Sequence, residues 1–264
     1  MRRRLAFAAL LTAGTLPAAL FHSNAIDSNT ERAPAISLRK RLNVNPLIAE
    51  PDTMNIEYGA EFSWDGSFTL PMTLHYTPEG HHSWWGRTEF SAAFDSISSD
   101  NGVHFGDRTT FAATCVVHDG DKLDLAIAPT ATILIRGDDG QRFGATAIAR
   151  YDSGRSSGGI TAVWSAATHA SPTNPAATFD FGFGYGFRLR TSGALGHLTP
   201  HANVIWEKST GIARQVSIFE GVEYQVTDPF AIDFALQHVS IWGGQPDRQF
   251  VIGLTLNTGR FHKH

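Results

Sequence analysis

The sequence predicts an all-β protein, a closed antiparallel transmembrane β-barrel of about 12 strands with a cleaved N-terminal signal peptide. Three observations lead to this prediction. Apolar and polar residues alternate with period 2 over most of the chain from Met54 onward. The alternating segments are each about 9 to 13 residues long, which suits a tilted strand that crosses a bilayer. No run of about 18 uncharged apolar residues follows the N-terminal segment, which excludes a polytopic helical membrane protein.

The start of the chain has the organisation of a secretory signal peptide. Three arginines follow Met1, an apolar stretch covers 5–21, and the small residues Ser23 and Ala25 favour cleavage after Ala25. We therefore expect an exported protein in three parts. Residues 1–25 are the signal peptide, residues 26–52 are a periplasmic leader, and residues 53–264 are the outer-membrane β-barrel.

The leader has no clean periodicity. It carries Pro34, Pro46 and Pro51 and the basic run Arg39-Lys40-Arg41. A segment of this composition predicts neither a strand nor a helix. We expect the leader either to be flexible or to tuck into the mouth of the barrel.

The strands follow from the alternation and from the turn residues between its segments. Segments 54–64 and 68–76 flank a tight turn at 65–67 and form a hairpin. Turn signals place further strands at 84–96, 104–118, 123–136, 142–151, 159–167, 179–190, 198–208, 216–226, 230–240 and 250–258. An even number of strands leaves both termini in the periplasm, and several of the connections that then face outside are the longer ones.

The residue types in these segments favour a barrel over a sandwich. In segment 179–190, aromatic residues and Leu189 alternate with Asp180, three glycines and two arginines. Lipid offers no partner to backbone N–H and C=O groups, so a sheet in a membrane has to close on itself. A soluble exported β-sandwich is the alternative, but its exposed charged face would seldom gather so many glycines.

Two places depart from the alternation. Glu220 falls on the apolar phase between Ile218 and Val222, so we expect a β-bulge at Glu220-Gly221 that turns the carboxylate inward. After Gln237 the phase of the eleventh strand is unclear.

The polar phase assigns a set of charged residues to the lumen. They are Arg87, Arg108, Arg136, Arg142, Arg150, Arg188 and Arg190, together with Glu57, Glu61, Glu89, Asp95, Asp124, Asp180, Glu207, Glu223 and Asp233. Six of the arginines fall on strands four to eight, and most of the acids fall on the other strands. We therefore expect a basic half and an acidic half, with a transverse field that sets selectivity for small solutes. The alternative is that these charges pair with one another and fill the lumen.

A few residues suggest other chemistry. His238 and Ser240 repeat the His-x-Ser spacing of outer-membrane phospholipase A, but Ile241 and Trp242 stand where that family has Asn-Gly, and no third residue is evident to orient the imidazole. We expect no enzyme, and lipid hydrolysis is the third hypothesis. We expect no cofactor and no metal, with the histidines at 81–82 and at 262 and 264 solvated.

Three short motifs carry a resemblance to a known family. The motifs are EPDTMNIEYG at 50–59, DPFAID at 228–233 and QFVIGLT at 249–255. They resemble the outer-membrane β-barrel transporter family named for the meta-pathway of phenol degradation. The resemblance implies a Gram-negative outer membrane and uptake of small, including aromatic, compounds, and it supplies no catalytic residues.

The expected function is therefore passive admission of small solutes through a charged lumen in the cell outer membrane. The expected partners are outer-membrane lipid, a small-molecule solute and the barrel insertion machinery. The 25 acidic and 21 basic residues leave a net charge of −4, which gives no reason to expect a nucleic-acid partner. The alternative is a non-conducting structural or adhesive barrel whose lumen is closed by salt bridges and by the leader.

Overall fold

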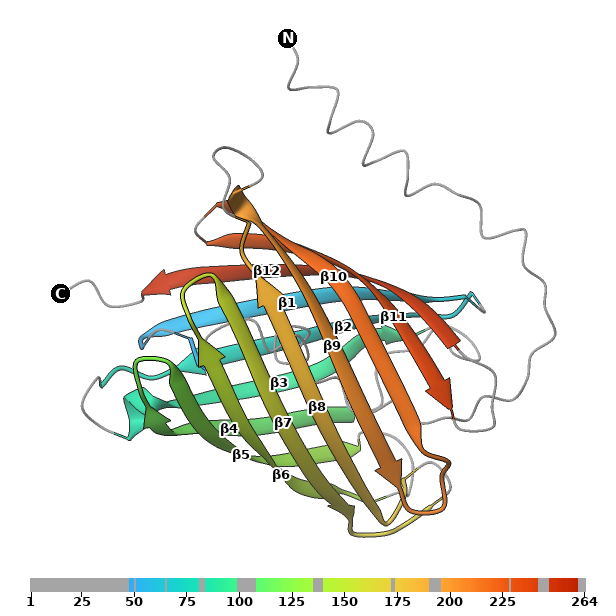
Figure 1. Cartoon of the computed structure of the whole chain (residues 1–264). Helices are drawn as coiled ribbons and strands as arrows, with labels where there is room; N and C mark the ends of the chain where they lie inside the picture. The colour runs from blue at the N-terminus through green and yellow to red at the C-terminus, as the bar shows by residue number, and fades with distance from the viewer. Residues whose placement is uncertain are drawn as a thin grey trace.

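The computed structural model describes residues 48–49, 51–64, 66–80, 84–98, 108–134, 140–171, 174–189, 196–227, 229–241 and 247–260. They form one closed antiparallel barrel, in which each strand pairs with its neighbours in sequence and β1 pairs with β12 (Figure 1). The predicted fold class and strand number are confirmed. The predicted signal peptide and most of the predicted leader lie outside the described residues.

The strands are close to those expected from the alternation. They are β1 (Thr53–Ser63), β2 (Phe68–Thr77), β3 (Thr88–Ser98), β4 (Arg108–Asp119), β5 (Leu123–Leu134), β6 (Arg142–Asp152), β7 (Ser156–Ala167), β8 (Ala177–Phe187), β9 (Leu198–Ser209), β10 (Gln215–Thr227), β11 (Phe230–Ile241) and β12 (Asp247–Arg260). A short 3-10 helix, η2 (Trp85–Arg87), precedes β3. Among the described residues, no helix is long and apolar enough to cross a membrane.

Strand β8 shows how the alternation of residue types in the sequence gives the barrel wall an inner and an outer face. Phe179, Phe181, Phe183 and Tyr185 are exposed on the outer face of the barrel, while Asp180 and the glycines between the aromatics are buried. Directly paired residues of antiparallel strands point to the same side of the sheet. The register therefore carries this division into inner and outer faces around the whole barrel.

The predicted bulge at Glu220 is wrong. Each residue from Gln215 to Tyr224 has a partner on both β9 and β11, so the carboxylate stays on the outer face and is exposed. Gly221 points inward beneath the ring of His201, and a Cβ there would lie 2.5 Å from His201 Cε1. The glycine serves this close approach to His201 rather than a bulge. The same register runs unbroken past Gln237, which settles the phase of β11.

The expected start of the third strand is also wrong. Residues 84–87 form η2 and its N-cap instead of extended chain, and the first paired residue is Thr88. Trp84 and Trp85 stack on each other with ring centroids 3.8 Å apart, and the Oγ1 of Thr88 donates to the carbonyl of Trp84. These contacts hold the connection at the rim of the barrel.

Candidate functional site

The inner face of the barrel is the candidate site because most of the predicted lumen residues meet there. Seven of them occupy inward positions and are buried, namely Glu57, Glu61, Glu89, Arg142, Arg150, Asp180 and Asp233. Four more share the inward phase and are half-buried, namely Arg108, Asp124, Glu207 and Glu223. Their roles in selectivity remain predictions.

The remaining predicted residues lie elsewhere. Arg87 belongs to η2 and forms an exposed ion pair with Asp119, with 3.8 Å between Nη2 and Oδ2, so its placement inside the lumen is corrected. Arg188 follows the last residue of β8, and its side chain is exposed. Arg136, Arg190 and the side chain of Asp95 lie outside what the structure describes.

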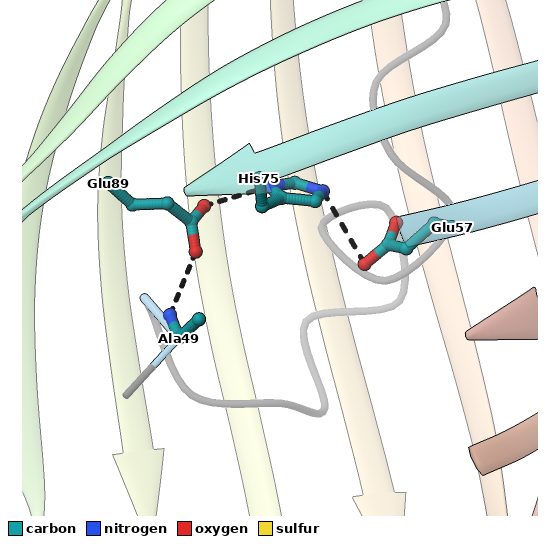
Figure 2. A network of polar contacts seen from close by, with 4 residues as sticks. All are labelled: Ala49, Glu57, His75 and Glu89. Atoms are coloured by element: carbon teal, nitrogen blue, oxygen red, sulfur yellow. Dashed lines mark hydrogen bonds and ion pairs between the residues drawn. The ribbon is translucent and has the colours of Figure 1, made fainter. Parts of the chain in front are cut away.

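A buried polar network lies near the mouth where the chain enters β1, which we call the N-terminal mouth. His75 of β2 lies between two carboxylates from the neighbouring strands (Figure 2). Its Nδ1 is 2.9 Å from Oε1 of Glu89, and its Nε2 is 3.5 Å from Oε1 of Glu57. Both ring nitrogens thus face acceptors, an arrangement that suits an imidazole with a proton on each nitrogen.

The same network holds the chain that precedes β1. The backbone N–H of Ala49 donates to Oε2 of Glu89 over 2.8 Å, so Glu89 joins this chain to His75 (Figure 2). Asp52 then turns into β1 with a positive φ of 63° and donates its N–H to the carbonyl of Thr77. The sequence did not point to His75, because only the register between strands shows which residues flank it.

A second buried cluster lies on the wall formed by β9, β10 and β11. His201 Nε2 is 3.9 Å from Asp233 Oδ1, and neither side chain is more than 2% exposed. Asn203 and Phe219 are buried beside them at inward positions. Polar groups on a surface open to water are normally accessible to it, so other atoms of the chain cover these side chains at this height.

Acids outnumber arginines at the inward positions that the structure describes. Asp180 is directly paired with Glu207, and Glu223 with Asp233, so two pairs of like charges lie side by side. Three of the six arginines predicted for the basic half do face inward, namely Arg108, Arg142 and Arg150. Asp124, Asp152 and Asp180 accompany them on β5, β6 and β8. The described wall is therefore mixed on one side and acidic on the other.

Arg150 and Arg142 differ in what they bind. Nη2 of Arg150 lies 2.6 Å from Oδ2 of Asp152, and Arg150 is directly paired with Gly159, which leaves space beside it. Arg142 instead donates to four neutral acceptors on β7, β8 and the connection between them. These are Oδ1 of Asn174, the carbonyl of Pro175, Oγ of Ser165 and Oγ1 of Thr178, at 2.7–2.9 Å. Its guanidinium anchors that connection.

The residues with possible enzymatic chemistry point away from the lumen. His238 and Ser240 lie on the outer phase of β11, paired with Ile218 and Val216 of β10. Within the described residues, no hydrogen bond joins the His238 ring to Ser240. The described part of the chain also holds no group of three or more His, Cys, Asp or Glu side chains placed to bind a metal ion. The histidines at 81–82, 262 and 264 lie outside the described residues.

The barrel is similar in fold to solved outer-membrane porins. The KdgM porin aligns with a TM-score of 0.53 and 9% identity over 79% of this chain and 99% of that chain. The KdgM porin in complex with disordered oligogalacturonate aligns with a TM-score of 0.55 and 10% identity over the same shares. The CymD monoaromatic hydrocarbon channel covers 88% of this chain and 96% of that chain at 10% identity, with a TM-score of 0.43 that is too low to bear on the solute.

No protein-family model matches the sequence, and no curated protein does. Both of the aligned structures with a TM-score above 0.5 that are described above are of the KdgM porin. The expected link to phenol degradation is not confirmed by them. At these identities the comparisons establish one conclusion, that this chain has the β-barrel fold of outer-membrane porins.

Proposed function

We propose that the protein is a passive outer-membrane channel for small hydrophilic solutes. One observation carries the proposal. The wall has polar side chains on its inner face and apolar side chains on its outer face, which is the reverse of a soluble protein. Acidic side chains such as Glu61 and Asp180 point inward, and aromatic side chains such as Phe181 and Trp164 point outward. A wall of this kind suits hydrocarbon outside and an aqueous path inside.

The charges of the wall suggest which solutes pass. Acids predominate at the described inward positions, so the bore attracts cations and repels anions. One carboxylate about 8 Å from a monovalent ion in water contributes about 0.5 kcal/mol, which salt at physiological strength reduces to about 0.2 kcal/mol. An excess of a few carboxylates over basic side chains along the bore therefore gives a several-fold preference for cations.

The solutes of the similar porins do not transfer directly. Oligogalacturonate carries carboxylates, and the paired acids Asp180–Glu207 and Glu223–Asp233 would repel them. Small cationic or neutral solutes fit the wall better. Passage of small aromatic compounds, which the family resemblance implied, stays a prediction.

Liposome swelling tests the proposed function. Vesicles that contain the purified protein should swell in neutral sugars at rates that fall as the sugar becomes larger, because a water-filled path sieves by size. The swelling rate should be higher for a cationic solute than for an anionic solute of equal size. A non-conducting structural barrel would give the rate of protein-free vesicles for every solute.

A further inference from the structure

We infer that the outer rim of the barrel binds the phosphate headgroup of an anionic lipid, where β11 ends and β12 begins. The site, which we call the rim patch, consists of His238 and Arg248 beside Trp64. It lies on the face that points away from the lumen. The inference therefore goes beyond the proposed channel and does not depend on conduction.

The register places the three side chains of the rim patch next to one another. His238 of β11 is directly paired with Arg248 of β12, and the Cβ atoms of such a pair lie about 4.5–5.5 Å apart on one face. The backbone N–H of Trp64 donates to the carbonyl of Arg248 over 3.1 Å, so Trp64 continues the row past the end of β1. His238 is also paired with Ile218, whose exposed side chain fixes this row on the face that meets lipid.

The rim patch lies at the edge of the apolar band. Arg248 is the second of the 14 residues of β12, and Trp64 follows the last residue of β1. Both therefore lie at the mouth opposite the N-terminal mouth, at the level where the aromatic girdle of a membrane barrel meets lipid headgroups. Trp64 is 65% exposed, which suits an indole ring at this interfacial level.

The basic groups of the rim patch have donors to offer. Within the described residues, no hydrogen bond or ion pair engages the guanidinium of Arg248 or the ring of His238. Asp247, the nearest acid in the sequence, lies on the inner phase and accepts from Gln249 and from the backbone N–H of Arg248. A guanidinium presents a planar fork of N–H donors that matches phosphate oxygens, and the imidazole adds a further N–H.

The charge of the neighbouring rim also favours an anion. Lys208 lies on the outer phase near the end of β9, paired with Phe179, and Arg214 is exposed just before β10. Among the described outward positions of β9 to β12, Glu220 is the acid, and it lies one step of the alternation deeper than His238. Basic side chains therefore predominate at headgroup level, and each Lys or Arg near a membrane surface strengthens the binding of anionic lipid about fivefold.

Fluorescence quenching by brominated lipids tests the rim patch. The full-length protein is held folded in micelles of a neutral detergent that contain either phosphatidate or phosphatidylcholine with the same brominated acyl chains. Phosphatidate should quench the tryptophans at a mole fraction at least about fivefold lower than phosphatidylcholine does. In Arg248→Gln/His238→Gln this preference should fall about fivefold, whereas Lys122→Gln, which removes an exposed charge at the N-terminal mouth, should keep it. Trp64→Phe should lose most of the preferential quenching, because Trp64 is the indole of the patch.

Equal quenching by the two lipids in the unchanged chain would overturn the inference. So would a preference that survives in Arg248→Gln/His238→Gln or in Trp64→Phe, because the lipid would then lie elsewhere on the barrel. Loss of the preference in Lys122→Gln would overturn it too, since overall charge would then explain the binding. Native mass spectrometry detects a second copy as the alternative occupant, and a dimer that needs Arg248 but ignores phosphatidate would count against the lipid. Heat-modified gel mobility shows that each variant is folded before it is scored.

Discussion

Glu220 offers a sharp test of which face of the wall meets hydrocarbon. It lies sixth among the 13 residues of β10, near the middle of the strand, and is exposed on the outer face. Its register partners, Ala202 on β9 and Leu236 on β11, are also exposed there. Replacing the carboxyl group by a hydrocarbon side chain in Glu220→Leu should therefore stabilise the barrel in lipid.

The expected size of this effect follows from the position. A basic side chain on the lipid face costs about 2–4 kcal/mol at the bilayer midplane, and an acidic one costs less. We therefore expect Glu220→Leu to raise the free energy of unfolding by about 1–3 kcal/mol. At about 2 kcal/mol the ratio of folded to unfolded protein changes roughly 30-fold.

Urea unfolding in lipid vesicles, followed by the fluorescence of the six tryptophans, measures the change. Glu223→Leu is the matched control, because Glu223 lies on the same strand but is paired with Asp233 on the inner face. It should not be stabilising. If Glu220→Leu is neutral or destabilising, or if both variants stabilise the barrel equally, the assignment of lipid to the outer face at this height is refuted.

Three further predictions follow from other contacts. Arg142→Ala removes four hydrogen bonds that hold the β7–β8 connection, so the free energy of unfolding should fall by about 2–4 kcal/mol. Protease should also cleave this connection faster. Unchanged cleavage would contradict the anchoring role of Arg142. Gly221→Ala should cost about 1–3 kcal/mol in urea unfolding because its Cβ would meet His201, whereas Gly158→Ala, whose closest contact would be 3.3 Å, should cost less. Arg150→Ala should shift the reversal potential in planar bilayers toward cations. Arg188→Ala should shift it less, because the Arg188 side chain is exposed after the end of β8, and equal shifts would show that burial in the wall is irrelevant.

The fold could be predicted from the sequence because apolar and polar residues alternate almost strictly along most of the strands. The sixth strand was expected at 142–151 and is Arg142–Asp152 in the structure. The expected third strand failed at its start, because Trp84 and Trp85 are compatible with a strand but stack in a 3-10 turn at the rim. Glu220 failed for a different reason. A carboxylate on the apolar phase predicts a bulge that turns it inward, but the register is unbroken and Gly221 lies beneath His201.

The candidate site was predictable only in part. Phase alone places Glu57 and Glu89 inside, since every second residue of a strand faces the lumen. It does not show that His75 lies between them, because their meeting depends on the register of three strands. The sequence also did not predict that Arg142 anchors the β7–β8 connection. Two of its acceptors, Asn174 and Pro175, lie in that connection, where the sequence has no alternation from which to predict contacts.

The reversal potential of the purified protein in a planar bilayer under a salt gradient tests the central claim most directly. A conducting bore lined mainly by acids predicts stepwise currents and a reversal potential of the sign given by cation preference. The absence of current, or a potential of the sign given by anion preference, would contradict the account.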